Sequence, residues 1–152
     1  MHMRALVQSS IVAVVIAGSA VTAAAPGRLV EITGNDQIKY NLTRIAAKPG
    51  ELLHVHIKSI GTLPKAVMSH NFVLLAKGTD PAAFAKAAAD AVATGYMPPQ
   101  FKAKVLASTP MVGPGESGDV TFKAPTVPGV YTFLCSFPGH FLAGMKGTLV
   151  VK

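Results

Sequence analysis

The stretch Gly129–Lys152, GVYTFLCSFPGHFLAGMKGTLVVK, decides how this chain folds. Residues 130–135 and 146–151 are short, rich in β-branched and aromatic residues, and therefore predict two strands joined by a loop. The joining segment holds the single cysteine, Cys135, followed by His140 and then Met145, with four residues between successive donors. A thiol, an imidazole and a thioether on one short loop are soft ligands, and that set favours copper.

The sequence upstream of this stretch predicts more strands of the same kind. Short alternating or apolar runs separated by Gly and Pro turns are expected to form strands at 28–33, 40–45, 51–59, 72–76, 103–106 and 118–123. Several short strands at this spacing are typical of a sandwich. We predict an all-β fold, a Greek-key antiparallel β-sandwich or barrel, with one inserted α-helix.

The inserted helix is expected over residues 82–93. Asp80 is a good N-cap, Pro81 suits the first helical position, and Gly95 is placed to end the helix. A narrow apolar stripe should pack on a sheet edge or on the end of the barrel, and it consists of Phe84, Ala87, Ala88, Ala91 and Val92.

The first residues resemble a secretory leader. A weakly basic start is followed by an apolar run at 11–21 and by small residues at 21–25. We expect residues 1–24 to be a signal peptide, cleaved after Ala23 or Ala24, and residues 25–152 to be one copper-binding domain. The alternative is an uncleaved anchor, but the apolar run is about half of the roughly 20 residues that a bilayer span needs. The expected location is the periplasm, with membrane association only if the leader is retained.

The charge distribution and the single cysteine limit the functions that this chain can have. The formal net charge is +7, but the lysines are spread singly, without a basic run or interleaved aromatic residues, so nucleic-acid binding is not expected. One cysteine cannot form an internal disulfide, and an idle thiol is a liability in an oxidising compartment. Cys135 is therefore expected to be occupied by a metal or a partner. We expect a monomer whose mature form has no obligatory membrane span.

The remaining histidines differ in their sequence context. His54 and His56 alternate with Leu53, Val55 and Ile57, so the pattern explains them as the polar outer face of a strand rather than as ligands. His70 lies between a loop and an apolar strand, a position from which a rigid scaffold can present a ligand. It is the best candidate for a second imidazole at the loop of Cys135.

Residues 63–74, LPKAVMSHNFVL, together with residues 130–152, resemble the azurin family of cupredoxins, which are small blue-copper electron carriers. The resemblance implies one copper ion per chain, with His70, Cys135 and His140 as strong equatorial ligands and Met145 as the axial ligand. It implies single-electron transfer between redox partners by a protein that is not an enzyme.

The same resemblance implies supporting roles for three neighbours. Asn71 would tie the two ligand-bearing segments together with Ser136 as its hydroxyl partner, and backbone N–H groups near Asn71 and Phe137 would donate to the cysteine sulfur. Ser69 stands where azurins usually have glycine, and the azurin disulfide cannot form. The four residues between His140 and Met145 resemble the spacing of auracyanin more than that of typical azurins.

A docking surface is also expected close to the copper. Redox partner proteins would dock on a hydrophobic patch around a partly exposed His140. Its candidate members, besides Phe137, are Leu63, Met68, Pro138, Gly139, Phe141 and Leu142. Phe141 and Leu142 are the residues we expect to be exposed, and Phe137 is the one most in doubt.

Two other functions use the same residues. A periplasmic copper chaperone or store would need the same donors, but the additional methionines are scattered and do not form a methionine-rich run. A hydrolase with Cys135 as nucleophile would leave Met145 without a role, and no helix N-terminus follows the cysteine to lower its pKa.

Overall fold

The computed structural model describes residues 26–152, so the predicted leader lies outside the described residues. The chain forms nine strands in this range: β1 (Arg28–Asn35), β2 (Lys39–Tyr40), β3 (Arg44–Ala47), β4 (Leu52–Ser59), β5 (Val73–Leu75), β6 (Val105–Ser108), β7 (Ser117–Lys123), β8 (Gly129–Leu134) and β9 (Lys146–Val151). Among residues 26–152, no helix combines the length and the apolar character that a membrane crossing requires.

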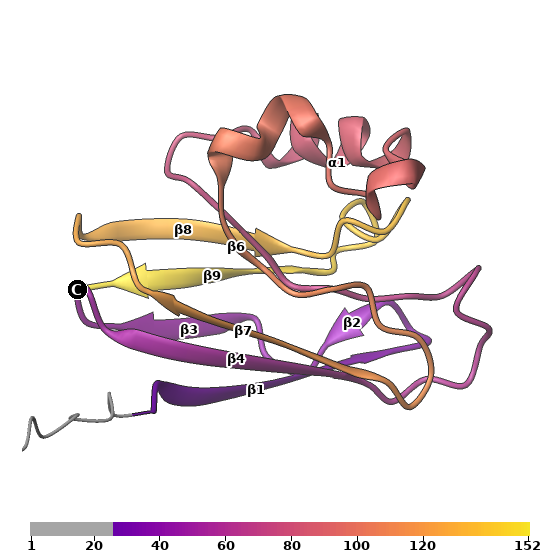
Figure 1. Ribbon diagram of the computed structural model, residues 1–152, viewed down its shortest axis with the longest axis horizontal. Coiled ribbons are helices and arrows are strands. Elements are labelled where there is room, and N and C mark those ends of the chain that lie inside the picture. Colours follow the sequence, from indigo (N-terminus) through magenta and orange to yellow (C-terminus); the bar gives the residue numbers. More distant parts are fainter. Residues whose placement is uncertain (1–25) are drawn as a thin grey trace, which may run out of the picture.

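The strands form two sheets packed as a sandwich, which confirms the predicted fold class (Figure 1). One sheet has the order β2-β1-β4-β7 and the other β3-β9-β8-β5-β6. The strands are not all antiparallel, because β1 pairs with β4 and β3 pairs with β9 in parallel. Residue alternation determines which face of a strand is buried but carries no information on the direction of its neighbour.

The run predicted as one strand at 40–45 is two strands, one in each sheet. The side-chain oxygen of Asn41 accepts a hydrogen bond of 2.8 Å from the backbone N–H of Thr33. This bond holds the chain at the end of β2, and β3 then begins at Arg44 in the opposite sheet. The crossing brings β3 beside β9, so the C-terminal strand is paired on both sides.

The core between the sheets follows from the alternation in β4. Leu53, Val55 and Ile57 have no exposed surface, while the intervening residues face outward. The opposite sheet contributes Phe133, whose ring centroid lies 5.2 Å from that of Phe72. Each side chain of this size stabilises the fold by about 1.5–3 kcal/mol when fully buried.

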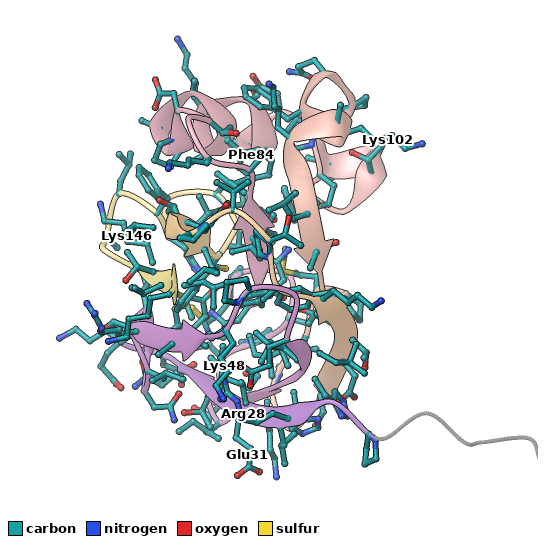
Figure 2. All side chains as sticks on the ribbon, turned by 90° about the vertical axis from the view of Figure 1, so that its left-hand side faces the viewer. Arg28, Glu31, Lys48, Phe84, Lys102 and Lys146 are labelled. Carbon is teal, nitrogen blue, oxygen red and sulfur yellow. The ribbon has the colours of Figure 1, made fainter. Side chains whose placement is uncertain are left out.

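The helix α1 (Pro81–Ala89) covers the outer face of the sheet that contains β5 and β8 (Figure 1). Asp80 caps it as predicted, accepting hydrogen bonds from the backbone N–H groups of Ala82 and Ala83. The side chain of Phe84 points from the helix toward the sheet (Figure 2) and packs with Ala88 into a second apolar cluster.

The helix ends earlier than predicted, at Ala89. A short 3-10 turn at Val92–Thr94 follows and ends at Gly95, whose φ of 64° is left-handed. Val92, expected in the buried stripe, is 64% exposed because it lies in this turn and not on the helix. A second 3-10 segment, Pro99–Lys104, leads into β6.

Candidate metal centre

The structure brings the predicted donor residues to one end of the sandwich. Cys135 directly follows β8 and Met145 directly precedes β9, with His140 in the loop between them. His70 lies just before β5, where its backbone exchanges hydrogen bonds of 2.9 and 2.8 Å with Val112. All four side chains are buried, and the β8–β9 loop lies at the end opposite the C-terminus (Figure 1).

Three of these side chains form a close cluster. One ligand atom each of His70, Cys135 and His140 lies within 4.8 Å of the others. The Cys135 Sγ atom is 3.4 Å from His140 Nδ1, and the two imidazole rings have centroids 5.1 Å apart. The carbonyl oxygen of Ser69 lies 3.8 Å from the same sulfur, so it faces the cluster.

The loop from Cys135 to Met145 is closed by its own backbone. The Cys135 N–H donates to the Met145 carbonyl at 3.1 Å, and the Met145 N–H donates to the His140 carbonyl at 2.9 Å. The Gly144 N–H donates to Phe141, and Gly144 has a φ of 96°. The bonds from Met145 to His140 and from Gly144 to Phe141, with Gly144 in the left-handed region, form the Schellman motif that ends helical turns. It accommodates four residues between His140 and Met145 while linking the two donors directly.

Hydrogen bonds between Asn71 and Ser136 join the two ligand-bearing segments. The Asn71 amide donates to the Ser136 hydroxyl at 2.8 Å, and its oxygen accepts from the Ser136 N–H at 2.8 Å. Behind this pair, the buried Tyr40 hydroxyl donates to the Asn71 carbonyl. Sequence reasoning missed Tyr40, because a tyrosine on a strand gives no sign of the loop that its hydroxyl reaches.

Close packing against His70 depends on a glycine in β1. A Cβ atom at Gly34 would lie 2.6 Å from the His70 ring, far inside the normal contact distance. Any side chain at position 34 would therefore displace the imidazole.

Burial controls the protonation of the cluster. It raises the pKa of the Cys135 thiol to about 12, although the backbone N–H groups of Asn71 and Phe137, which donate to the sulfur, act in the opposite direction. Burial, and secondarily the neighbouring His70, lowers the pKa of His140 to about 4. Burial also lowers the pKa of His70. The metal-free centre therefore holds a thiol and two neutral imidazoles at neutral pH.

These residues fit a copper ion. Both ring nitrogens of His70 are buried and have no well-aligned hydrogen bond among residues 26–152, although the Asn35 backbone lies close enough to the ring to raise its pKa against the effect of burial. Burying a polar group without a partner costs free energy, and a metal ion would satisfy one of these nitrogens. Two imidazoles and a thiolate with a thioether nearby are the donor set of blue-copper sites.

The structure corrects two expectations about the surface. His140 is only 2% exposed, because the Phe137 ring lies over it with centroids 4.8 Å apart. Phe141 is 8% exposed and packs beneath α1 in the second apolar cluster, with Lys146 Nζ 4.4 Å from its ring centre. Leu142, by contrast, is exposed as expected.

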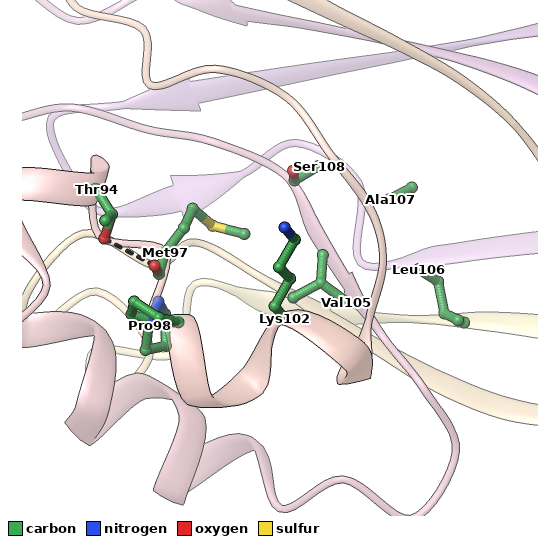
Figure 3. A pocket seen from close by; sticks show the side chains of 9 residues that line it. Thr94, Met97, Pro98, Lys102, Val105, Leu106, Ala107 and Ser108 are labelled. Atoms are coloured by element: carbon green, nitrogen blue, oxygen red, sulfur yellow. Dashed lines mark hydrogen bonds between the residues drawn. The ribbon is translucent and has the colours of Figure 1, made fainter.

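Two surface hollows flank the site without containing its donors. One, of about 650 Å³, is formed by Met97, Pro98, Lys102 and the strand β6 (Figure 3). It approaches the centre through Met97, whose sulfur is 4.0 Å from the Ser136 hydroxyl. The other, of about 550 Å³, lies between α1 and the apolar residues Phe137, Phe141 and Leu142.

His54 and His56 lie on the outer face of β4, as their alternation predicted. Their side chains lie on the outside of the sheet, away from the buried cluster, and contact Asp119 of β7 instead. Asp119 was not singled out from the sequence. Its alternation within 118–123 gives the face on which it lies, but only the β4–β7 register places it beside the histidines.

Comparisons with known proteins agree with this geometry. Residues 27–152 match the family described as copper binding proteins, plastocyanin/azurin family. The chain is 38% identical over 136 residues to auracyanin-B of Chloroflexus aurantiacus, covering 88% of this chain and 56% of that protein. It thus spans little more than half the length of that relative.

Other relatives are covered almost completely. Azurin of Pseudomonas denitrificans is 38% identical over 129 residues, which are 81% of this chain and 97% of azurin. The crystal structure of dithionite-reduced auracyanin from Roseiflexus castenholzii superposes with a TM-score of 0.68 at 32% identity, covering 84% of this chain and 99% of that one.

Proposed function

This chain belongs to the plastocyanin/azurin family of copper-binding proteins, and on that premise we propose that it carries single electrons between redox partners. His70, Cys135 and His140 would hold one copper ion, and Met145 would supply the fourth donor. The observation that carries the proposal is the buried cluster in which both His70 nitrogens lack a partner while a thiol and a second imidazole lie within reach.

When bound, copper supplies a Cu(II)/Cu(I) couple that exchanges one electron. The chain holds the donors in place through bonds that do not involve the metal. Asn71 and Ser136 fix the two ligand-bearing segments to each other, and the bond from the Met145 N–H to the His140 carbonyl fixes the axial residue. Rigid support of this kind orients the ligands and limits their movement between redox states.

The donor set also explains why electron transfer is favoured over catalysis. Catalytic metal sites retain an open position for water or substrate, whereas four protein donors fill the coordination shell. His70, Cys135 and His140 are buried, so small molecules have no direct access to them. Electrons would pass through the thin protein layer around His140.

Redox partners dock over this layer. Leu142 is 85% exposed and Leu63 43% exposed, and Pro138, Gly139 and Met68 lie in the same two segments. The hollow beside α1 extends this surface and is bordered by Lys86 and Asp90. A small apolar surface gives weak, short-lived complexes, which suit a carrier.

The place of action that we propose is the periplasm. Residues 1–24 would be removed as a signal peptide, leaving a monomeric domain from residue 25. The apolar leader sequence and the relationship to azurin support this location.

Redox cycling of the copper-loaded protein tests the proposed function. We expect one electron per chain to be taken up and released over repeated cycles, with copper retained in the presence of a chelator. A copper chaperone or store would instead lose its metal to the chelator within minutes. That outcome would refute the carrier function while leaving copper binding intact.

The docking surface has a separate test in electron self-exchange between oxidised and reduced copies, measured by NMR. Leu142→Lys should slow self-exchange by at least about tenfold, because like charges at the contact oppose association. Val130→Lys is the matched control, since Val130 is 57% exposed near the start of β8, at the opposite end of that strand from Cys135. Equal rates in both variants would place the contact elsewhere.

A further inference from the structure

The outer face of the sheet β2-β1-β4-β7 carries a second group of metal-binding side chains. His54 Nε2 and His56 Nδ1 each lie 2.8 Å from the same oxygen, Oδ1 of Asp119. The two histidines come from one strand and the aspartate from its antiparallel neighbour. The strand pattern explains why these residues face solvent, but it does not require both imidazoles to meet one carboxylate oxygen.

The strand register adds a fourth donor to this face. His56 is directly opposite Asp119 in β7 and directly opposite Glu31 in β1. The side chain of Glu31 points away from the sheet into solvent (Figure 2). Opposite residues on one sheet face have Cβ atoms about 5 Å apart, so Glu31, His56 and Asp119 form a row across three strands.

We propose that His54, His56 and Asp119 bind one divalent transition-metal ion of the Zn²⁺ type, with Glu31 as a fourth oxygen donor. Two imidazoles and a carboxylate are ligands that zinc commonly uses. Each imidazole would bind the ion through the nitrogen that now faces Asp119, with its proton on the other ring nitrogen, and Glu31 or water would fill the remaining positions.

Two of the three distances between ligand atoms are close to those that a metal needs, whereas the two imidazole nitrogens stand farther apart than the 4.8 Å that encloses the ligand atoms of the copper cluster. Ligands in a tetrahedral zinc site stand about 3.3 Å apart when each bond is about 2.0 Å. The two nitrogen–oxygen distances of 2.8 Å would therefore lengthen only slightly. The two imidazole nitrogens must also approach each other, and the partly exposed rings of His54 and His56 are free to turn toward a common ion.

The electrostatics favour an added cation. Hydrogen bonds from His56 and His54 lower the pKa of Asp119, so it is ionised at neutral pH. Glu31 and Asp119 together place two carboxylates around the two imidazoles, with Lys58 as the cation on the same face of β4. Because the side chains are exposed, binding requires little desolvation and little movement of the backbone.

This site differs from the copper centre in ways that can be measured. It offers no thiolate, so Cu²⁺ bound there would show only weak visible bands. Its ligands are open to solvent, so the ion would exchange rapidly. It would also crosslink β4 and β7, which pair antiparallel through these positions.

The test is calorimetric titration of Zn²⁺ into the full chain with the copper centre already filled. We expect one Zn²⁺ per chain, and we expect His54→Gln and His56→Gln each to weaken binding at least about tenfold. The double variant should abolish this binding, and Asp119→Asn should weaken it. Lys58→Gln is the matched control on the same strand face, and His2→Gln controls for binding near the start of the chain.

Two results would overturn the proposal. One is unchanged Zn²⁺ affinity in the double variant, which would place the ion elsewhere. The other is the absence of any binding up to about 1 mM Zn²⁺, which would leave the three residues as a hydrogen-bonded surface cluster. The blue absorption and the unfolding midpoint of each variant, measured without zinc, show whether the fold and the copper centre are intact.

Discussion

The chain places histidines in two settings that differ in what their ring nitrogens meet. His70 and His140 are buried beside a thiol, and both nitrogens of His70 lack a partner among residues 26–152. His54 and His56 lie on an open sheet face, where one carboxylate accepts from both. His70 gains a bonding partner when a metal binds, whereas His54 and His56 already share a carboxylate.

Metal binding therefore has a different consequence for stability in each of the two settings. A buried, unsatisfied cluster makes metal binding part of the stability of the fold, because the free energy lost on burial is recovered only when the ion binds. An exposed, satisfied cluster makes metal binding optional. Perturbing each region should therefore have effects of very different size.

Removing copper should have the largest effect. At free copper about 1,000 times its dissociation constant, binding to the folded state alone adds about 4 kcal/mol, which should raise the unfolding midpoint by more than about 10 °C. Thermal unfolding of copper-loaded and metal-free protein measures the difference. The His54→Gln/His56→Gln variant should show the same gain, and a midpoint that does not respond to copper would remove the distinction between the regions.

Acid should destabilise the metal-free protein through the buried pair. Because the pKa of His140 is lowered to about 4, the unfolded chain binds a proton before the folded chain does as the pH falls below 6.5. Stability is therefore present above pH 6.5 and is lost by about 3 kcal/mol as the pH falls to about 4. Urea unfolding across this range should show the slope in wild type and a shallower slope in His140→Gln, whereas equal slopes would contradict the assignment.

Asn71→Ala should cost about 2 kcal/mol, because it leaves the buried N–H and hydroxyl of Ser136 without the partner that each has now. Ser136→Ala is the matched comparison. It keeps the bond from the Ser136 N–H to the Asn71 oxygen and should cost about half as much. Chemical denaturation of the metal-free variants measures both, and equal losses would show that the bond to the backbone N–H contributes little.

The smallest effect is expected for Asp119→Asn in the absence of metal. The Asp119 side chain is 51% exposed, and exposed pairs of this kind contribute little to stability because water and salt screen them. The unfolding free energy should change much less than in Asn71→Ala, and the blue absorption should stay the same. A loss comparable to that of Asn71→Ala would show that the outer cluster is structural and not optional.

Local chemistry made much of the fold predictable. Alternation identified the buried face of β4, and Asp80 with Pro81 marked the beginning of α1. These signals act over a few residues and survive in any tertiary context. The end of α1 was less predictable, because alanine has a high helix propensity but contributes little to the packing that decides where a helix stops.

Non-local contacts were not predictable from one sequence. Pattern alone gave neither the parallel pairing of β1 with β4 nor the division of 40–45 between two sheets. Phe141 and Leu142 are adjacent apolar residues in one loop, yet only the position of α1 decides that Phe141 is covered. Asp119 meets the histidines through a register that only the folded sheet defines.

The donor residues could be recognised for a different reason. Cys135, His140 and Met145 are close in sequence, and His70 precedes a strand in a recognisable segment. What the sequence did not reveal was the environment of these donors. The complete burial of His140 beneath Phe137 depends on how the loop closes around Gly144.

The visible absorption of the purified protein with Cu(II) tests the central claim most directly. We expect one copper per chain and an intense band from charge transfer between the Cys135 sulfur and copper, and we expect Cys135→Ser to abolish it. A colourless protein that binds Cu(II) with only ordinary weak bands, in wild type and variant alike, would contradict the account.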